Sequence, residues 1–260
     1  MAERADRDPI DGAAGRRTDA PRGIFITFEG GEGAGKTTHI RFLADALRAH
    51  GREVVRLREP GGTDIGERLR AIVLDPRNEA MSDEAELLVY EAARAQIVAE
   101  VIAPALARGA VVLCDRFTDS TVAYQAYGRG LPRAFVDAAN EFACQGVRPD
   151  RTILLETGGA AGKGLARATR RGADRLEQAG EGFHARVNAA FADIARKDPE
   201  RVRTVRSDGR KSRTAAAVFA QLADLFPWMA DIEREDPGFF GRLDARRSRP
   251  GRSRAARKGE

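Results

Sequence analysis

A glycine-rich loop at residues 30–37 constrains the fold of this chain more than any other feature of the sequence. The loop reads GGEGAGKT and has glycine, lysine and threonine at the spacing of a phosphate-binding loop, G-x-x-x-x-G-K-[ST]. An apolar, β-branched run at 23–28 precedes it and predicts a buried strand, and apolar residues at helical spacing follow Lys36. A strand, a glycine loop and a helix in this order indicate a nucleotide-binding α/β fold, whereas a plain connecting turn is the alternative.

The backbone and side chains of this loop offer positive charge to phosphate groups. The first N–H groups of a helix have no partner within the helix, and the helix dipole places partial positive charge there. Glycines let the loop curl so that more N–H groups point inward. Lys36 adds a full charge near the β- and γ-phosphates, and the Thr37 hydroxyl can bind Mg²⁺. We therefore predict that ATP contacts the whole segment: Gly30, Gly31, Glu32, Gly33, Ala34, Gly35, Lys36, Thr37 and Thr38.

Strand and helix patterns alternate along the rest of the chain. Further strands are predicted at 53–57, 110–114, 152–155 and 202–205, and further helices at 65–73, 83–108, 132–144, 183–195 and 214–226. Asp83 with Glu86 suggests a capping box for the longest helix, and Pro104 a break near its end. This order predicts an α/β P-loop NTPase fold with a doubly wound, five-stranded parallel sheet flanked by helices.

The carboxyl ends of parallel strands are where such folds bind ligands. Both the phosphate loop and the pair Asp115-Arg116 follow strands at such ends, so we expect them to face one another. His39, one helical turn past the loop, is expected at the surface.

The two ends of the chain differ in composition from the rest. Residues 1–22 are polar and without periodicity, so we expect a disordered extension. Eight basic and two acidic residues lie within 241–260 and give this segment a charge of +6, so that residues 1–240 contribute −1 to the net charge of +5. We therefore expect a basic, disordered tail at 230–260 that binds nucleic acid only weakly and without specificity, next to a single domain at 23–229.

The cysteines and the hydropathy of the sequence indicate the cellular compartment of the chain. It has no apolar run of about 18 residues and no apolar core of a signal peptide, so no membrane span or export is expected. Cys114 and Cys144 both lie in apolar segments, which predicts buried free thiols and a reducing, cytoplasmic location.

Several groups of residues together resemble bacterial thymidylate kinases, which are P-loop nucleoside monophosphate kinases. They are the loop and its flanks at 28–38, REPGGT at 58–63, DRF at 115–117 followed by Ser120, Tyr124 and Gln125, GRGL at 128–131, and DRLE at 174–177. The resemblance covers about residues 23–228. It implies a phosphotransferase that moves the γ-phosphoryl group of ATP to dTMP, giving dTDP for dTTP synthesis, with Mg²⁺, as a cytoplasmic homodimer.

The same resemblance implies roles for individual residues. Arg70 and Arg116 would clamp the phosphate of dTMP, since guanidinium groups match phosphate oxygens two at a time. Glu32 would reach the sugar 3′-hydroxyl, and Asp115 would orient Mg²⁺ together with Thr37. The base and sugar would lie against four further residues, Tyr90, Arg94, Thr121 and Tyr124. Tyr90 stands where the family usually has the phenylalanine that stacks on thymine.

The source of the catalytic arginine separates thymidylate kinases into types. Gly33 occupies the loop position at which some members carry a basic residue, whereas arginines crowd residues 158–175, the expected lid over ATP. The chain thus resembles the lid-arginine type, with Arg167 and Arg171 joining Lys36 and Arg116 in catalysis. Glu156 to Ala160 depart from the usual turn at the start of the lid, which leaves the register of these arginines open.

Other function classes share the phosphate loop. A kinase of another nucleoside monophosphate needs only a different base pocket. A GTPase switch would carry an Asn-Lys-x-Asp motif, and the asparagines at 78, 140 and 188 do not begin one. A DNA-associated ATPase would carry an acidic pair where Asp115 is followed by Arg116. A non-catalytic nucleotide-binding module is disfavoured by the intact Lys36 and Thr37.

Overall fold

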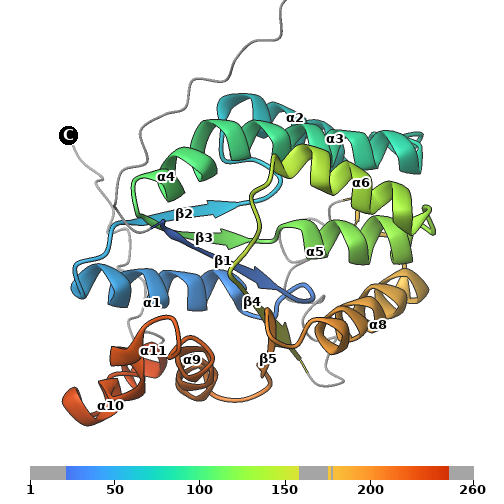
Figure 1. The fold of residues 1–260 in the computed structure, drawn as a ribbon. Helices are drawn as coiled ribbons and strands as arrows, with labels where there is room; N and C mark the ends of the chain where they lie inside the picture. The colour runs from blue at the N-terminus through green and yellow to red at the C-terminus, as the bar shows by residue number, and fades with distance from the viewer. Residues whose placement is uncertain (1–21, 158–174, 177, 246–260) are drawn as a thin grey trace, which may run out of the picture.

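A five-stranded parallel sheet forms the centre of the computed structural model, which describes residues 22–157, 175, 176 and 178–245 (Figure 1). Its strands are β1 (Ile24–Glu29), β2 (Val54–Arg58), β3 (Val111–Asp115), β4 (Arg151–Glu156) and β5 (Val202–Arg206). They lie in the order β2-β3-β1-β4-β5, and every neighbouring pair is parallel. This confirms the predicted doubly wound α/β sheet.

Helices cover both faces of the sheet (Figure 1). On one face lie α1 (Lys36–Ala49) and α9 (Lys211–Ala220); on the other lie α2 (Asp64–Leu74), α3 (Asp83–Ile97), α6 (Arg133–Cys144) and α8 (Glu181–Lys197). Successive residues of β1 point to opposite layers: Ile26 and Phe28 pack with α1, and Phe25 packs with Val112 and Cys114 of β3. Both layers are therefore built from the same short strands, as expected for strands buried on both sides.

The longest predicted helix, at 83–108, is three consecutive pieces in the structure. After α3 the chain widens into the π-helix η1 (Val98–Ile102) and continues as α4 (Ala103–Ala107), so the break precedes Pro104. The cap of α3 also differs from the prediction. Ser82, not Asp83, is the N-cap, and its hydroxyl accepts a hydrogen bond from Ala85 N at 3.2 Å.

The prediction of a disordered tail from residue 230 is wrong for its first part. Residues 227–245 form the 3₁₀ helix η4 (Pro227–Ala230) and the short helices α10 (Ile232–Glu235) and α11 (Arg242–Ala245). Phe239, Phe240 and Leu243 are buried in the core beside α1 and α9, and this burial outweighs the polar composition around them. Residues 1–21 and 246–260 lie outside the described part.

The described residues bear on two further sequence-based expectations, one about the state of the cysteines and one about membrane-spanning helices. Cys114 and Cys144 are buried free thiols, as predicted. Within the described ranges, no helix combines the length and apolarity that crossing a membrane requires.

The strand register brings three loops together at one edge of the sheet. Phe28 of β1 and Arg58 of β2 both stand level with Asp115 of β3. The phosphate loop, the loop after β2 and the turn after β3 consequently start side by side. The helix α5 (Thr118–Thr121) and the π-helix η2 (Val122–Gly128) continue from that turn.

Candidate active site

A cavity of about 490 Å³ lies at this edge of the sheet. It is lined by the phosphate loop, the loop after β2, the helices α2 and α3, and the segment from Asp115 to η2. The predicted site residues that line it are Glu32, Gly33, Ala34, Gly35, Lys36, Thr37, Thr38, Arg70, Tyr90, Arg94, Asp115, Arg116, Thr121 and Tyr124. Gly30 and Gly31 do not line it, and the predicted lid residues Arg167 and Arg171 lie outside the described residues.

The phosphate loop needs glycine at two positions. Gly30 has φ 124°, and a Cβ atom there would lie 2.3 Å from the carbonyl oxygen of Leu155 on β4. Gly35 has φ 92° and directly precedes α1, whose first residue is Lys36. The loop is thus pressed against the sheet and turns sharply into the helix, which leaves the first N–H groups of α1 available to an anion.

Lys36 is held by the loop that it follows. Its Nζ atom donates to the carbonyl oxygens of Gly30 at 3.0 Å and Gly31 at 3.1 Å. Burial, reinforced by the nearby guanidinium of Arg116, lowers the pKa of this ammonium group from its ordinary value. A phosphate group entering the cavity would meet a preorganised donor.

Two oxygen atoms from different elements meet beside the start of α1. The hydroxyl of Thr37 donates to Oδ2 of Asp115 at 3.0 Å. Hydroxyl and carboxylate oxygens are hard ligands that suit Mg²⁺, which keeps several waters and takes its other ligands from phosphates. Thr37 and Asp115 offer two such oxygens, which leaves the remaining ligands of an ion bound there to water and to the phosphates of a nucleotide. Among the residues described, no group of three or more His, Cys, Asp and Glu could hold a metal ion.

Arg116 occupies an unusual backbone conformation at the centre of the cavity wall. Its φ of 72° lies in the left-handed region, and its N–H donates to Phe28 O at 2.9 Å. The guanidinium group forms an ion pair with Glu32, donates to the Ser120 hydroxyl at 3.0 Å, and lies 5.1 Å from the centre of the Tyr124 ring. The charge of Arg116 is the main cause that lowers the pKa of Glu32 to about 2.

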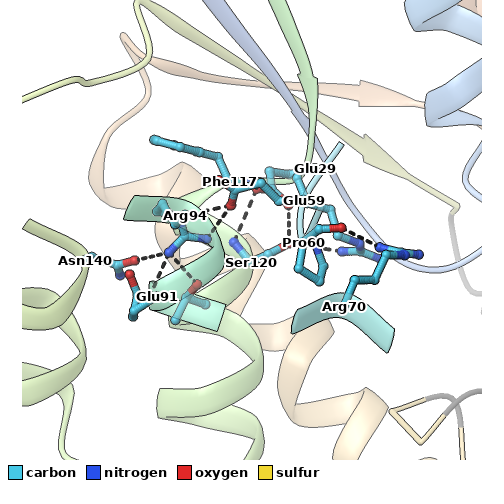
Figure 2. Close-up of polar contacts among 11 residues, drawn as sticks. Glu29, Glu59, Pro60, Arg70, Glu91, Arg94, Phe117, Ser120 and Asn140 are labelled. Atoms are coloured by element: carbon cyan, nitrogen blue, oxygen red, sulfur yellow. Dashed lines mark hydrogen bonds and ion pairs between the residues drawn. The ribbon is translucent and has the colours of Figure 1, made fainter. Parts of the chain in front are cut away.

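A buried carboxyl group supports the turn that carries Arg116. Glu29, the last residue of β1, is fully buried and accepts hydrogen bonds from Phe117 N at 2.8 Å and from the Ser120 N–H and hydroxyl at 3.3 and 2.6 Å (Figure 2). Burial raises its pKa to about 7. Sequence reasoning missed this residue, although a charged residue at the end of an apolar strand was a visible signal.

Arg70 approaches the cavity from α2. Its Nη1 atom donates to the carbonyl oxygen of Pro60 at 2.9 Å, in the loop after β2 (Figure 2). Arg58 donates to the same carbonyl at 3.0 Å, so that two guanidinium groups converge on this loop. The loop therefore sets the position of Arg70 relative to the phosphate loop.

Arg94 is fixed by protein groups on every side. The side chain is only 2% exposed, and it donates to Glu59 at 2.7 and 2.9 Å and to Glu91 at 2.7 Å. It also donates to the Thr121 hydroxyl at 2.9 Å and to the Asn140 side chain at 2.6 Å (Figure 2). Two carboxylates balance its charge, so this arginine can present a fixed edge to a ligand but not a mobile cation.

Of the partners of Arg94, Thr121 was predicted from the sequence as a site residue, whereas Glu59, Glu91 and Asn140 were not. Glu59 lies in the REPGGT segment and so carried a signal. Asn140 lies in the middle of α6, 46 residues from Arg94, and its position in the sequence gave no signal of a role in the site. The cavity is also lined by Gln125, Leu176 and His184, which likewise were not among the predicted site residues.

Aromatic residues form the remaining wall. Tyr90 on α3 is half-buried and lines the cavity. Tyr124 on η2 is buried and packs edge-on against Phe183 of α8, with 5.9 Å between ring centres. Burial raises the pKa of Tyr124 to about 12. Its phenol therefore stays neutral, as a contact to a sugar would require.

A second cavity of about 490 Å³ shares Gly33, Ala34, Gly35 and Thr38 with the first. Its other walls are His39, the segment between β5 and α9, the first turn of α9, and one residue of α11. His39 is 4% exposed, so the prediction of a surface position is wrong. The imidazole packs beside Gly35, burial and the charge of Lys211 lower its pKa to about 4, and its Nδ1 has no partner among the described residues.

Comparison with known proteins supports a specific kinase family. A family model for thymidylate kinase matches residues 28–216. Thymidylate kinase from Pseudomonas syringae is 48% identical over 213 residues, covering 82% of this chain and 99% of the relative. The Geobacter sulfurreducens enzyme is 49% identical over 212 residues, covering 79% and 99%. A crystal structure of thymidylate kinase from Ehrlichia chaffeensis is similar at 31% identity, with a TM-score of 0.64 and coverage of 78% of this chain and all of that one.

Proposed function

Because the chain belongs to the thymidylate kinase family, whose members transfer the γ-phosphoryl group of ATP to dTMP, we propose that the first cavity is where this transfer takes place. One observation carries the proposal: Arg70 and Arg116 line the same cavity as Lys36 and the other residues of the phosphate loop. A donor triphosphate on the loop and an acceptor monophosphate on the two arginines would therefore meet within one space.

The donor nucleotide is assigned to the phosphate loop and the second cavity. The β- and γ-phosphates lie on the N–H groups at the start of α1 and on Lys36. The base of ATP extends into the second cavity, which shares residues with the loop but not with the acceptor wall. Thr37 and Asp115 are the residues that would hold Mg²⁺. When bound, this ion neutralises charge on the phosphates.

The acceptor nucleotide is assigned to the opposite wall. Arg70 and Arg116 bind the phosphate of dTMP, and Glu32 accepts a hydrogen bond from the 3′-hydroxyl. The base packs on Tyr90 and presents its edge to Arg94 and Thr121, and the sugar lies against Tyr124. The contacts that hold Arg94 rigid favour one base shape over others, since a fixed hydrogen-bonding edge rejects a mismatched base.

In this arrangement the protein catalyses the transfer by positioning the two nucleotides and by stabilising the charge on the transferred phosphoryl group. An oxygen of the dTMP phosphate attacks the γ-phosphorus of ATP, the bond to the β,γ-bridging oxygen breaks, and ADP leaves with that oxygen. Negative charge spreads over the transferred group, and Lys36 and Arg116 stabilise it from two sides. Arg167 and Arg171 are proposed to add charge from the lid.

We also propose a cytoplasmic homodimer. On α6, Phe142 is 86% exposed and Phe135 53% exposed, and Leu88 on α3 is 56% exposed. The two helices are in contact, and large apolar side chains grouped on neighbouring helices favour burial against a second copy.

A coupled assay of the purified protein with ATP, Mg²⁺ and dTMP, dUMP, dCMP or dAMP tests the function. We expect turnover with dTMP, slower turnover with dUMP, and little with dCMP or dAMP. Preference for dCMP or dAMP would indicate a kinase of another nucleotide. ATP binding without turnover on any acceptor would indicate a non-catalytic module, and Lys36→Ala supplies the inactive reference for this comparison.

A further inference from the structure

The short helix α11 brings a carboxylate from the C-terminal part of the chain to the second cavity. The family match ends at residue 216, whereas α10 and α11 belong to residues 232–245. Asp244 of α11 nevertheless lines the cavity together with phosphate-loop residues (Figure 1 shows α11 beside α9 and below α1). We propose that Asp244 is a positioning residue for the donor nucleotide, which rests on the assignment of this cavity to the base of ATP.

Aromatic packing holds the C-terminal segment in place. The ring of Phe239 lies 4.9 Å from that of Phe42 on α1 and 5.6 Å from that of Phe219 on α9. Phe240 lies 5.1 Å from Phe219, and Leu243 is buried in the same core cluster. Because these side chains lie within five residues of Asp244, its carboxylate has a defined position relative to α9.

Asp244 caps the N-terminus of α9 from another part of the chain. Its Oδ2 accepts the Ser212 hydroxyl hydrogen bond at 2.6 Å, and its Oδ1 accepts from Ser212 N at 3.4 Å. The residue at the N-cap position, Arg210, makes no side-chain cap bond, so Asp244 supplies the missing acceptor. The hydrogen bond from Ser212 lowers the pKa of Asp244, which keeps the carboxylate charged beside the positive end of the helix dipole.

The capped helix start is connected to the phosphate loop. The Ser207 hydroxyl donates to the carbonyl oxygen of Ala34, and Ser207 N donates to Glu156 O at 2.7 Å. The cavity walls between these two fixed points include Arg210 and Lys211. Asp244 therefore sets the far end of the segment that would enclose the base, and the phosphate loop sets the near end.

His39 provides an independent indication that this cavity receives a polar ligand. Its side chain is nine-tenths or more buried, lines the cavity, and has a ring nitrogen without a partner among the described residues. A buried nitrogen of this kind is satisfied when a ligand offers a matching group. His39, Ser212 and Asp244 do not line the first cavity, so substitutions at these positions should change the binding of ATP and not that of dTMP.

Steady-state kinetics of Asp244→Ala test the proposal. Loss of the capping carboxylate loosens the start of α9, so we expect KM for ATP to rise roughly five- to tenfold, with kcat and KM for dTMP changed less than about twofold. Ser212→Ala should give a similar rise, and the double variant should add little to either single one. Asp244→Glu should recover part of the affinity for ATP.

Asp236→Ala is the matched control. It breaks an exposed ion pair between Asp236 and Arg242 in the same segment, 2.7 Å long, and should leave KM for ATP unchanged. Unchanged KM for ATP in both Asp244→Ala and Ser212→Ala, or an equal rise in KM for dTMP, would overturn the proposal. Failure of the proposed function looks different, since wild-type protein would then not phosphorylate dTMP.

Discussion

Glu32 of the phosphate loop and Arg116 of the turn after β3 form an ion pair across the first cavity. The pair joins the two elements assigned to the donor and the acceptor, and Arg116 keeps Glu32 ionised by lowering its pKa to about 2. A carboxylate among phosphate groups would otherwise be repelled, so the arginine allows Glu32 to serve as a hydrogen-bond acceptor near bound nucleotides. The affinity for dTMP should therefore depend on both partners.

Replacement of Arg116 should separate activity from stability. Arg116→Ala removes the phosphate contact, and we expect kcat/KM for dTMP to fall by roughly 2–4 kcal/mol of transition-state stabilisation, about 30- to 1,000-fold. Arg116→Gly should be equally inactive but about 0.5–1 kcal/mol more stable than Arg116→Ala in urea unfolding, because φ is 72° at this position. Arg133→Ala, in an exposed pair with Asp137, is the control, and a comparable loss there would contradict the assignment.

Glu32→Gln should weaken discrimination at the sugar 3′-position. A hydrogen bond from a hydroxyl to a charged carboxylate contributes about 1.5–3 kcal/mol, so wild-type protein should prefer dTMP over its 3′-deoxy analogue by roughly 10- to 100-fold in kcat/KM. We expect this ratio to shrink toward unity in the variant, as measured by competing the two acceptors. A preference that survives the substitution would place the 3′-hydroxyl elsewhere.

Thr37→Val should impair the use of Mg²⁺. The substitution keeps the shape of the side chain but removes the hydroxyl that contacts Asp115 at 3.0 Å. We expect the Mg²⁺ concentration for half-maximal rate to rise and kcat to fall about tenfold or more, because the ion contributes several kcal/mol of charge stabilisation. Thr37→Ser retains the hydroxyl and should stay near wild type; if both variants behave alike, the hydroxyl is not a ligand.

Glu29 should make the stability of the protein depend on pH. Its pKa is raised from 4.5 to about 7 in the folded state, so between these values the folded protein binds more protons than the unfolded chain. The free energy of unfolding should then fall as pH rises, by on the order of 3 kcal/mol in total from this group. In urea unfolding at pH 4.5 to 8, Glu29→Gln should lose this contribution to the slope, whereas Glu59, whose pKa burial also raises to about 7, should keep its own.

The exposed Glu141 offers the comparison for this experiment. Glu141→Gln on α6 makes the same chemical change at an exposed position and should keep the wild-type slope. Equal pH profiles for wild type and Glu29→Gln would mean that the buried carboxyl titrates normally.

Phe142→Glu should dissociate the proposed homodimer. The ring is 86% exposed on α6, and a charge within an apolar interface leaves a desolvated carboxylate without a partner. We expect light scattering after gel filtration to give twice the monomer mass for wild type and the monomer mass for the variant. Glu235→Lys, on α10 at the other side of the sheet, should remain dimeric, and a monomeric wild type would contradict the assembly.

Much of the fold was predictable because its signals are local. The phosphate loop, its strand and its helix follow from spacing, and β1 and α1 lie where they were expected. The π-helices η1 and η2 were not predictable, since one extra residue in a turn leaves little trace in apolar periodicity.

Burial was less predictable than secondary structure. His39 was assigned to the surface because the sequence does not show which residues pack against a histidine at this position. The structure shows that the His39 side chain is buried beside Gly35. Residues 230–245 were assigned to a tail from their charge, whereas the two rings at 239 and 240 decide their position. The phosphate-loop residues were named from the motif itself and the other site residues through the resemblance, and their roles stay predictions.

The aromatic cluster that joins Phe42, Phe219, Phe239 and Phe240 has a consequence for shortened versions of the protein. A stop codon at residue 230, where the charged region begins, would remove half of this cluster and leave the outer sides of α1 and α9 in water. An uncovered apolar area of that kind promotes aggregation. A shortened version of this enzyme should therefore end after residue 245, and not at residue 216, where the family match ends.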